Sequence, residues 1–108
     1  MTTYGGRCHN VPMKAERVVC ERIVFGDGAI IDIKVWRVPA QMPGSKHFLK
    51  YLLFYGKPAL RLICYDNERG KGDHRHYDQH EERYGFISIE QMLADFRSDV
   101  EKLRGERI

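Results

Sequence analysis

The sequence predicts an α+β fold: an antiparallel sheet of four to five strands, built as two consecutive hairpins and covered by one C-terminal amphipathic helix. Three observations predict it. β-prone segments fill residues 14–66, turn residues separate them in pairs, and after residue 88 the apolar residues take the period of a helix. The 108 residues are enough for one core. We expect a loose arm at residues 1–13 and a single α+β domain at residues 14–108.

The first predicted hairpin joins residues 14–25 to residues 29–38. The first arm contains RVVCERIVF, which is rich in β-branched residues, and GDG at 26–28 supplies a turn. In the second arm, apolar residues alternate with charged ones in the order Ile31, Asp32, Ile33, Lys34 and Val35. This alternation is typical of a strand with one buried face.

The second predicted hairpin follows a loop at residues 39–46 that contains two prolines and a glycine. Its arms, HFLKYLLFY and ALRLICYD, flank Gly56-Lys57-Pro58 and are rich in aromatic and aliphatic residues. Short further strands are expected at residues 74–77 and 84–87.

The C-terminal segment has the pattern of a capped amphipathic helix. Ser88 suits the N-cap, Gln91 completes a capping box three residues later, and Gly105 suits the left-handed residue that ends a helix. The apolar side chains expected on one helical face are Ile89, Met92, Leu93, Phe96, Val100 and Leu103. Such a helix needs an apolar surface to cover, and the sheet provides one.

Composition excludes several classes of protein. The formal net charge of +3 is too small to indicate a nucleic-acid-binding protein by itself. No apolar run approaches the roughly 20 residues that span a bilayer, and no apolar N-terminal stretch resembles an export signal. The three cysteines form no C-x-x-C pair. We therefore expect a cytoplasmic protein without membrane contact.

The stretch DNERGKGDHRHY, residues 66–77, concentrates the side chains that can carry chemistry. On a strand, His74 and His76 project to one face, roughly 6–7 Å apart along the chain. Two imidazoles can transfer protons near neutral pH, bind a transition metal, or contact an anion beside nearby cations. A solvated turn without chemistry has the same spacing, so the spacing alone leaves all four possibilities open.

The chain as a whole resembles the TumE family, whose members are toxin components of bacterial toxin–antitoxin pairs. The resemblance covers residues 17–104 and is carried by KVWRVP, KHFLKYLLFYG, YDNERGKGDHRHY and FISIEQMLADFRSDV. It implies a small bacterial protein whose antitoxin is similar to helix-turn-helix DNA-binding proteins. The residues that match the family's characteristic segment are Asp66, Asn67, Gly70, Asp73, His74 and His76, and no catalytic roles come with them.

Many small toxins of similar size cleave RNA, so the leading hypothesis is a metal-independent ribonuclease acting on single-stranded or messenger RNA. His74 and His76 would act as base and acid, Lys71 would stabilise charge on the phosphate, and Asp73 would orient an imidazole. The residues expected to bind the substrate are Asp66, Asn67, Arg69 and Arg75.

Two alternatives stay open. The basic turn could bind RNA or a partner protein without catalysis. Alternatively, the histidine pair could form a metal site with a third ligand from His80, His47 or Asp66. No H-E-x-x-H pattern supports a metal, and we expect neither a metal nor a cofactor. An open sheet edge would also favour a homodimer.

Overall fold

The computed structural model describes residues 15–67, 70–77 and 79–108, and the arm expected at residues 1–13 lies outside them. The described residues form a six-stranded antiparallel sheet and one helix. The elements are β1 (Glu16–Val24), β2 (Ile30–Arg37), β3 (Leu49–Lys57), β4 (Leu60–Asp66), β5 (His74–Tyr77), β6 (His80–Arg83) and α1 (Ile89–Arg104). The predicted α+β class is confirmed, with one strand more than expected.

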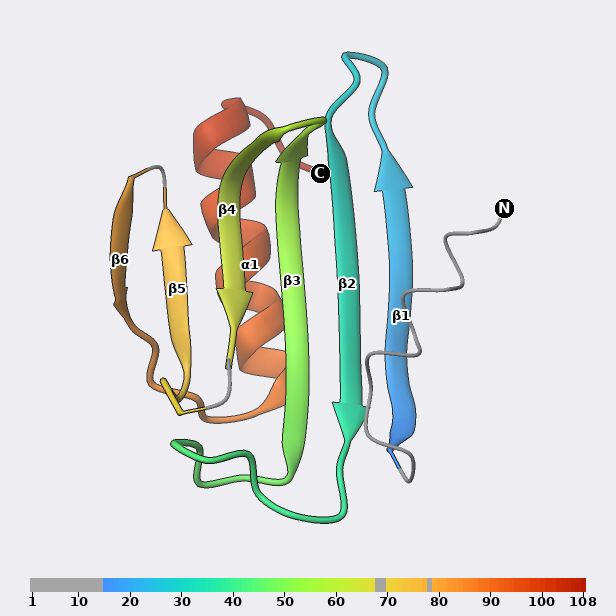
Figure 1. The fold of residues 1–108 in the computed structure, drawn as a ribbon. Coiled ribbons are helices and arrows are strands. Elements are labelled where there is room, and N and C mark those ends of the chain that lie inside the picture. Colours follow the sequence, from blue (N-terminus) through green and yellow to red (C-terminus); the bar gives the residue numbers. More distant parts are fainter. Residues whose placement is uncertain (1–14, 68–69, 78) are drawn as a thin grey trace.

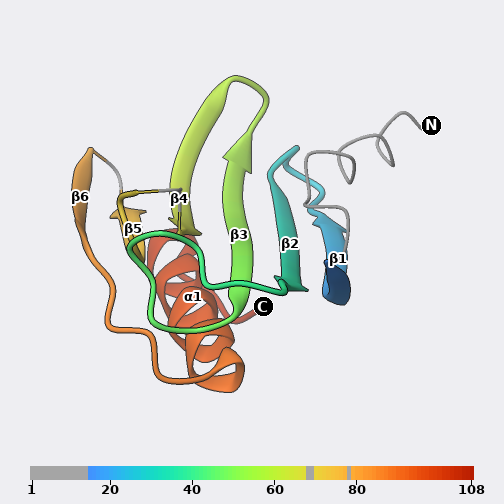
Figure 2. The same cartoon turned by 60° about the horizontal axis from the view of Figure 1, so that its bottom comes forward.

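The strands lie side by side in chain order, and each is antiparallel to the next (Figure 1). The helix α1 crosses one face of the sheet, behind β3, β4 and β5 in Figure 1. In the part of the chain that the structure describes, no helix lies on the opposite face, and Figure 2 shows α1 on one side of the sheet only. The sheet therefore has one face packed on the helix and one without a helix.

The last strand differs from the prediction. The strand expected at residues 84–87 is absent, and residues 84–88 have no regular structure. β6 instead begins at His80, because β5 turns back at once and pairs Tyr77 with His80. This tight hairpin brings His76 opposite Glu81, which matters for the site.

The hydrophobic core lies between α1 and the covered face of the sheet. The three apolar residues of the alternation predicted for the second strand are buried on the covered face. The other face of this strand is not simply exposed as expected, because Lys34 and Trp36, which alternate with them, are buried too. Phe96 of α1 meets the Tyr65 ring edge-on, with 5.5 Å between ring centroids. The largest deeply buried side chains of the core are Ile31, Val35, Tyr51, Leu53, Ile63, Tyr65, Met92, Phe96 and Val100.

The predicted ends of the helix are confirmed. The Ser88 hydroxyl accepts a hydrogen bond from the Gln91 backbone N–H at 3.1 Å, and Gly105 takes the left-handed conformation with φ of 75°. The Gln91 side-chain amide donates to Asp95 at 2.8 Å. Among the described residues, no helix is long and apolar enough to cross a membrane.

Two loops dock on each other at the lower end of the sheet, which Figure 2 brings forward. One runs from residue 38 to 48, between β2 and β3, and the other leads into β5. The Gly70 N–H donates to the Pro43 carbonyl at 2.9 Å. A Cβ atom on Gly72 would lie 2.6 Å from the Gly44 carbonyl oxygen, so the two backbones touch. The glycines of the predicted site thus serve loop docking.

Replacing Gly72 by alanine is expected to lower the free energy of unfolding by roughly 2 kcal/mol or more, because positive φ strains a side-chain-bearing residue and the new Cβ meets a carbonyl. The φ of Gly72 is 77° and that of Gly28 is 91°, but a Cβ on Gly28 would meet nothing within 4 Å. Gly28→Ala is the matched control and should lose only the strain, measured by urea unfolding. Equal losses in the two variants would contradict the docking argument.

Candidate functional site

The two predicted histidines lie on β5, on the sheet face without a helix. Their rings meet edge-on, with 5.4 Å between centroids, so the expectation that they share a face is confirmed. In the strand register, the neighbours of His74 are Asp66 and Arg83, and those of His76 are Cys64 and Glu81. We call Asp66, His74, His76 and Glu81 the histidine cluster.

His74 is the inner member of the histidine cluster and is 5% exposed. Its Nδ1 lies 3.0 Å from the Gly72 carbonyl oxygen, which can only accept, so Nδ1 carries a proton. Its Nε2 lies 2.7 Å from Asp66 Oδ1 and 3.5 Å from Glu81 Oε2. The imidazole is therefore held by a backbone carbonyl on one side and faces two carboxylates on the other.

His76 is the outer member and is more accessible than His74. Its Nε2 lies 3.4 Å from Glu81 Oε2, and its Nδ1 lies 3.5 Å from an Nη atom of Arg61. One Glu81 oxygen therefore stands between the Nε2 atoms of both histidines. Arg61 places a positive charge beside the pair.

Asp73 belongs to a different cluster at the lower end of the sheet. Its carboxylate accepts hydrogen bonds from the Ser45 hydroxyl at 2.7 Å and the Tyr51 hydroxyl at 2.8 Å. A third contact runs to His47 Nε2 at 2.6 Å. We call Ser45, His47, Tyr51 and Asp73 the Asp73 cluster; the imidazole that Asp73 orients is that of His47.

The hydrogen bonds of His47 fix its tautomer. The Leu49 backbone N–H donates to His47 Nδ1 at 3.2 Å, so in the neutral ring the proton sits on Nε2 and is donated to Asp73. Both ring nitrogens are therefore in use. The ring also lies against Phe86, with 4.2 Å between centroids. The His47 side chain therefore has a structural role.

Asn67, which was expected to bind substrate, is 1% exposed. Its amide nitrogen donates to the Leu49 carbonyl at 2.7 Å and to the Ser45 hydroxyl at 3.3 Å. Its oxygen accepts from the Tyr51 backbone N–H at 3.0 Å. The side chain thus continues the pairing of β3 beyond the end of β4 and holds the Asp73 cluster in place.

Arg75 projects to the other face of β5, as the alternation predicts. Its guanidinium contacts Asp99 of α1 at 3.3 Å and Glu82 of β6 at 2.7 Å, and donates to the Tyr65 hydroxyl at 3.0 Å. It therefore joins the sheet to the helix and lies apart from the histidine cluster. Lys71 is exposed in the loop before β5, and Arg69 lies outside the described residues.

Three buried tyrosines donate to aspartates: Tyr51 to Asp73, Tyr65 to Asp99 and Tyr84 to Asp95. In each case burial, followed by that hydrogen bond, raises the pKa of the tyrosine above its ordinary value. Because the unfolded chain releases these protons near pH 10 and the folded protein retains them, stability is complete below about pH 10 and falls as pH rises further.

We expect the free energy of unfolding to fall above about pH 10 by up to ~1.4 kcal/mol per pH unit for each of the three tyrosines. Tyr51→Phe should make this fall less steep, measured by urea unfolding at a series of alkaline pH values. Parallel curves for the wild type and the variant would show that Tyr51 takes no part.

Comparison with known proteins identifies the family. The family model described as Toxin TumE matches residues 11–104. The chain belongs to the TumE toxin family. The resemblance inferred from the sequence is thereby confirmed, and membership in a toxin family implies an antitoxin partner. No curated protein and no solved structure matches the chain.

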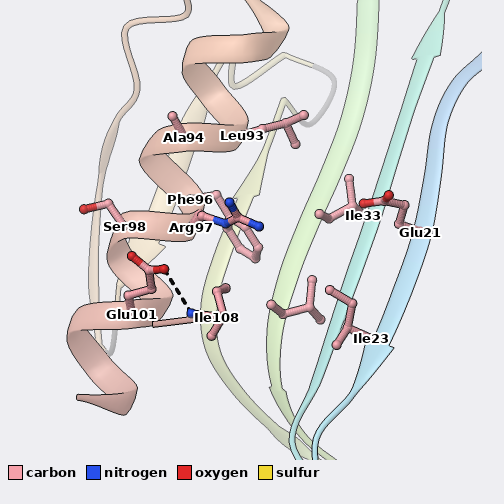
Figure 3. Close-up of a pocket in the computed structure, with 11 residues that line it drawn as sticks. Glu21, Ile23, Ile33, Leu93, Ala94, Phe96, Arg97, Ser98, Glu101 and Ile108 are labelled. Atoms are coloured by element: carbon pink, nitrogen blue, oxygen red, sulfur yellow. Dashed lines mark hydrogen bonds between the residues drawn. The ribbon is translucent and has the colours of Figure 1, made fainter. Parts of the chain in front are cut away.

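One cavity in this TumE family member lies away from both clusters. It is a groove of about 440 Å³ between α1 and the strands β1 and β2, with Ile23, Ile33 and Phe96 along its floor (Figure 3). Its lining also includes the charged residues Glu21, Arg97 and Glu101. A smaller cavity of about 310 Å³ lies beside His47 and Asp73. We place the candidate site of the TumE protein at the histidine cluster, because proton-transferring and ligating groups converge there.

Two residues of this TumE site, Glu81 and Arg61, are not among those predicted from the sequence. Glu81 had a signal: a tight turn after β5 pairs Tyr77 with His80 and so sets His76 opposite Glu81. Arg61 had none, because its contact with His76 depends on how a long side chain lies across β4.

Proposed function

We propose that this toxin cleaves single-stranded or messenger RNA in the cytoplasm as a metal-independent ribonuclease, using His74 and His76. Its antitoxin is a helix-turn-helix protein in this proposal. The observation that carries the proposal is the pair of imidazoles on the sheet face without a helix, with one oxygen of Glu81 facing the Nε2 atoms of both. Their unequal surroundings suit unequal roles.

His76 is the base in this proposal and His74 is the acid. His76 is the more accessible ring and takes the proton of the RNA 2′-hydroxyl as the 2′-oxygen forms a bond to phosphorus. The bond from phosphorus to the 5′-oxygen breaks, and His74 gives its proton to that oxygen, with Glu81 linking the rings. The products carry a 2′,3′-cyclic phosphate and a 5′-hydroxyl.

The surrounding charges support an anionic substrate. Arg61 lies beside His76, and Arg83 stands opposite His74 in the strand register. Both are exposed. Two guanidinium groups on this face can stabilise the additional negative charge that develops on the phosphate during cleavage.

The test is cleavage of a labelled single-stranded RNA by the purified protein. We expect the wild type to cleave it in the presence of EDTA, and His76→Gln to lose roughly 100-fold in rate. A 2′-deoxy nucleotide at the cleaved position should block the reaction, since it removes the nucleophile. In cells, induced expression should arrest growth with the wild type and not with His76→Gln.

His80→Gln is the matched control. His80 lies on β6, and its exposed side chain contacts Glu82 at 3.3 Å, outside the histidine cluster. This variant should cleave RNA like the wild type. RNA binding without cleavage, together with growth arrest by His76→Gln, would replace the proposal by a binding module that acts through occupancy.

A further inference from the structure

We infer that the histidine cluster is a binding site for a divalent transition-metal ion of the zinc class. His74, His76 and Glu81 each offer one ligand atom, and these three atoms lie within 4.8 Å of one another. We assign them as the two Nε2 atoms and Glu81 Oε2, because both Nε2 atoms face that oxygen. They come from β5 and β6, two strands of one tight hairpin. The backbone pairing therefore fixes the positions from which the three side chains start.

The spacing of the ligand atoms fits tetrahedral coordination. Metal–ligand bonds of about 2.0–2.1 Å at tetrahedral angles separate neighbouring ligand atoms by roughly 3.3–3.4 Å. The Glu81 oxygen lies 3.5 Å from the Nε2 of His74 and 3.4 Å from that of His76. Rotation of the accessible His76 and Glu81 side chains can bring the two nitrogens to the same separation. These distances are longer than hydrogen bonds, and an ion fits between the atoms.

His74 already has the proton arrangement of a metal ligand. A ligating imidazole usually donates its second N–H to a backbone carbonyl or a carboxylate, which fixes the tautomer and leaves the other nitrogen's lone pair for the metal. His74 donates Nδ1–H to the Gly72 carbonyl at 3.0 Å. In the neutral ring, its Nε2 lone pair therefore points toward the carboxylates.

Asp66 provides independent support. Its Oδ1 is a buried oxygen that has no hydrogen-bond donor within the described part of the chain, although it lies 2.7 Å from His74 Nε2. A neutral His74 has no proton on Nε2 to give, so two lone pairs face each other unless the ring takes up a second proton or a cation binds beside them. A metal ion on His74 is such a cation, and water in the fourth position can donate to Asp66.

The ligand set selects the ion. Two imidazoles and a carboxylate suit zinc, cobalt and similar ions, whereas magnesium and calcium prefer oxygen ligands throughout. The two carboxylates of the cluster carry two negative charges when ionised, which a divalent ion balances. Neighbouring ligands of a tetrahedral ion lie roughly 3.3–3.4 Å apart, whereas Asp66 Oδ1 lies only 2.7 Å from His74 Nε2. Asp66 therefore does not take the fourth position, which stays open to water.

Arg61 opposes metal binding at His76. Its Nη donates to His76 Nδ1 at 3.5 Å, and this contact favours the tautomer with a proton on Nε2. A metal on Nε2 requires the proton to move to Nδ1, which breaks the contact. Removing the guanidinium should therefore strengthen metal binding, and Arg61→Met should bind the ion more tightly than the wild type.

The experiment uses the untagged full chain, treated with EDTA and dialysed. Cobalt(II) is titrated in and its visible absorption is followed, and zinc binding is measured by calorimetry. We expect one ion at this site, and Glu81→Gln and His76→Gln should each weaken binding roughly 10–100-fold or more. Glu81 is exposed, so its variant should fold, as circular dichroism will confirm.

His80→Gln is the control and should bind the metal like the wild type, because His80 contacts Glu82 outside the cluster. Zinc should raise the thermal unfolding midpoint of the wild type and of His80→Gln, and at the same concentration should raise that of Glu81→Gln less. No bound ion, or equal affinity in the wild type and in folded Glu81→Gln, would overturn the site.

The effect of the ion on activity rests on the proposed ribonuclease function, whereas its binding does not. If both Nε2 atoms hold a metal, neither can transfer a proton, and zinc should inhibit RNA cleavage. Binding with inhibition supports both proposals. Binding with faster cleavage supports the metal site and overturns the metal-independent mechanism, because the ion would then activate the reaction.

Discussion

Replacing Asp73 by alanine is expected to lower the free energy of unfolding by about 4 kcal/mol, because a partly buried carboxylate that holds three side chains is lost. The hydroxyls of Ser45 and Tyr51 and the Nε2–H of His47 would then face an empty space. With a total stability of roughly 5–15 kcal/mol, the loss is a large fraction. Urea unfolding followed by circular dichroism measures it.

Asp27→Asn is the control for this prediction. Asp27 is an exposed carboxylate that contacts Arg104 at 3.2 Å, and its replacement should change stability little. Asp73→Asn keeps the size of the side chain and one acceptor oxygen, and should lose less than Asp73→Ala. If Asp73→Ala unfolds at the same urea concentration as the wild type, the Asp73 cluster does not hold the two loops together.

Replacing Arg75 by methionine is expected to lower the free energy of unfolding by about 3 kcal/mol, because Asp99 and the Tyr65 hydroxyl both lose their contact with the guanidinium between the sheet and α1. Methionine retains most of the aliphatic length, so the loss reports mainly on the guanidinium. The contact with Glu82 is more exposed and should contribute little. Thermal and urea unfolding both measure the change.

Arg37→Met serves as the matched control, since Arg37 contacts Glu16 at 3.7 Å in an exposed pair. Such a pair is worth about 0–1 kcal/mol, and its loss should be small. A measurement of RNA binding distinguishes the structural role of Arg75 from the substrate-binding role expected from the sequence. A folded Arg75→Met protein that loses RNA binding without losing stability would restore Arg75 to the substrate site.

The fold was predictable where one local signal decided the structure. The apolar period, the Ser88 cap and Gly105 predicted α1, and the alternation around Asp32 predicted which residues of β2 belong to the core. The end of the sheet was not predictable in the same way. HYDQHEERYGFI contains several possible turns, and strand propensity favours residues 84–87 over the charged residues that form β6.

The candidate site was predictable in part, because period two places His74 and His76 on one face of any strand. Sequence spacing does not reveal which carboxylate meets which imidazole. Asp73 is adjacent to His74 in the chain but contacts His47, 26 residues away in the sequence. Asp66 contacts His74 because β4 and β5 pair in one particular register. Which carboxylate contacts which imidazole depends on how distant segments pair, and a single sequence does not specify that pairing.

The order of the sheet has a consequence for synthesis on the ribosome. Each strand pairs with the strand made just before it, so β1 to β6 can pair in the order in which they emerge. The helix that covers their apolar face follows all six strands in the chain. Until α1 emerges, the nascent sheet presents bare apolar surface, and the core cannot close. A toxin built in this order completes its fold only after its histidine pair has left the ribosome.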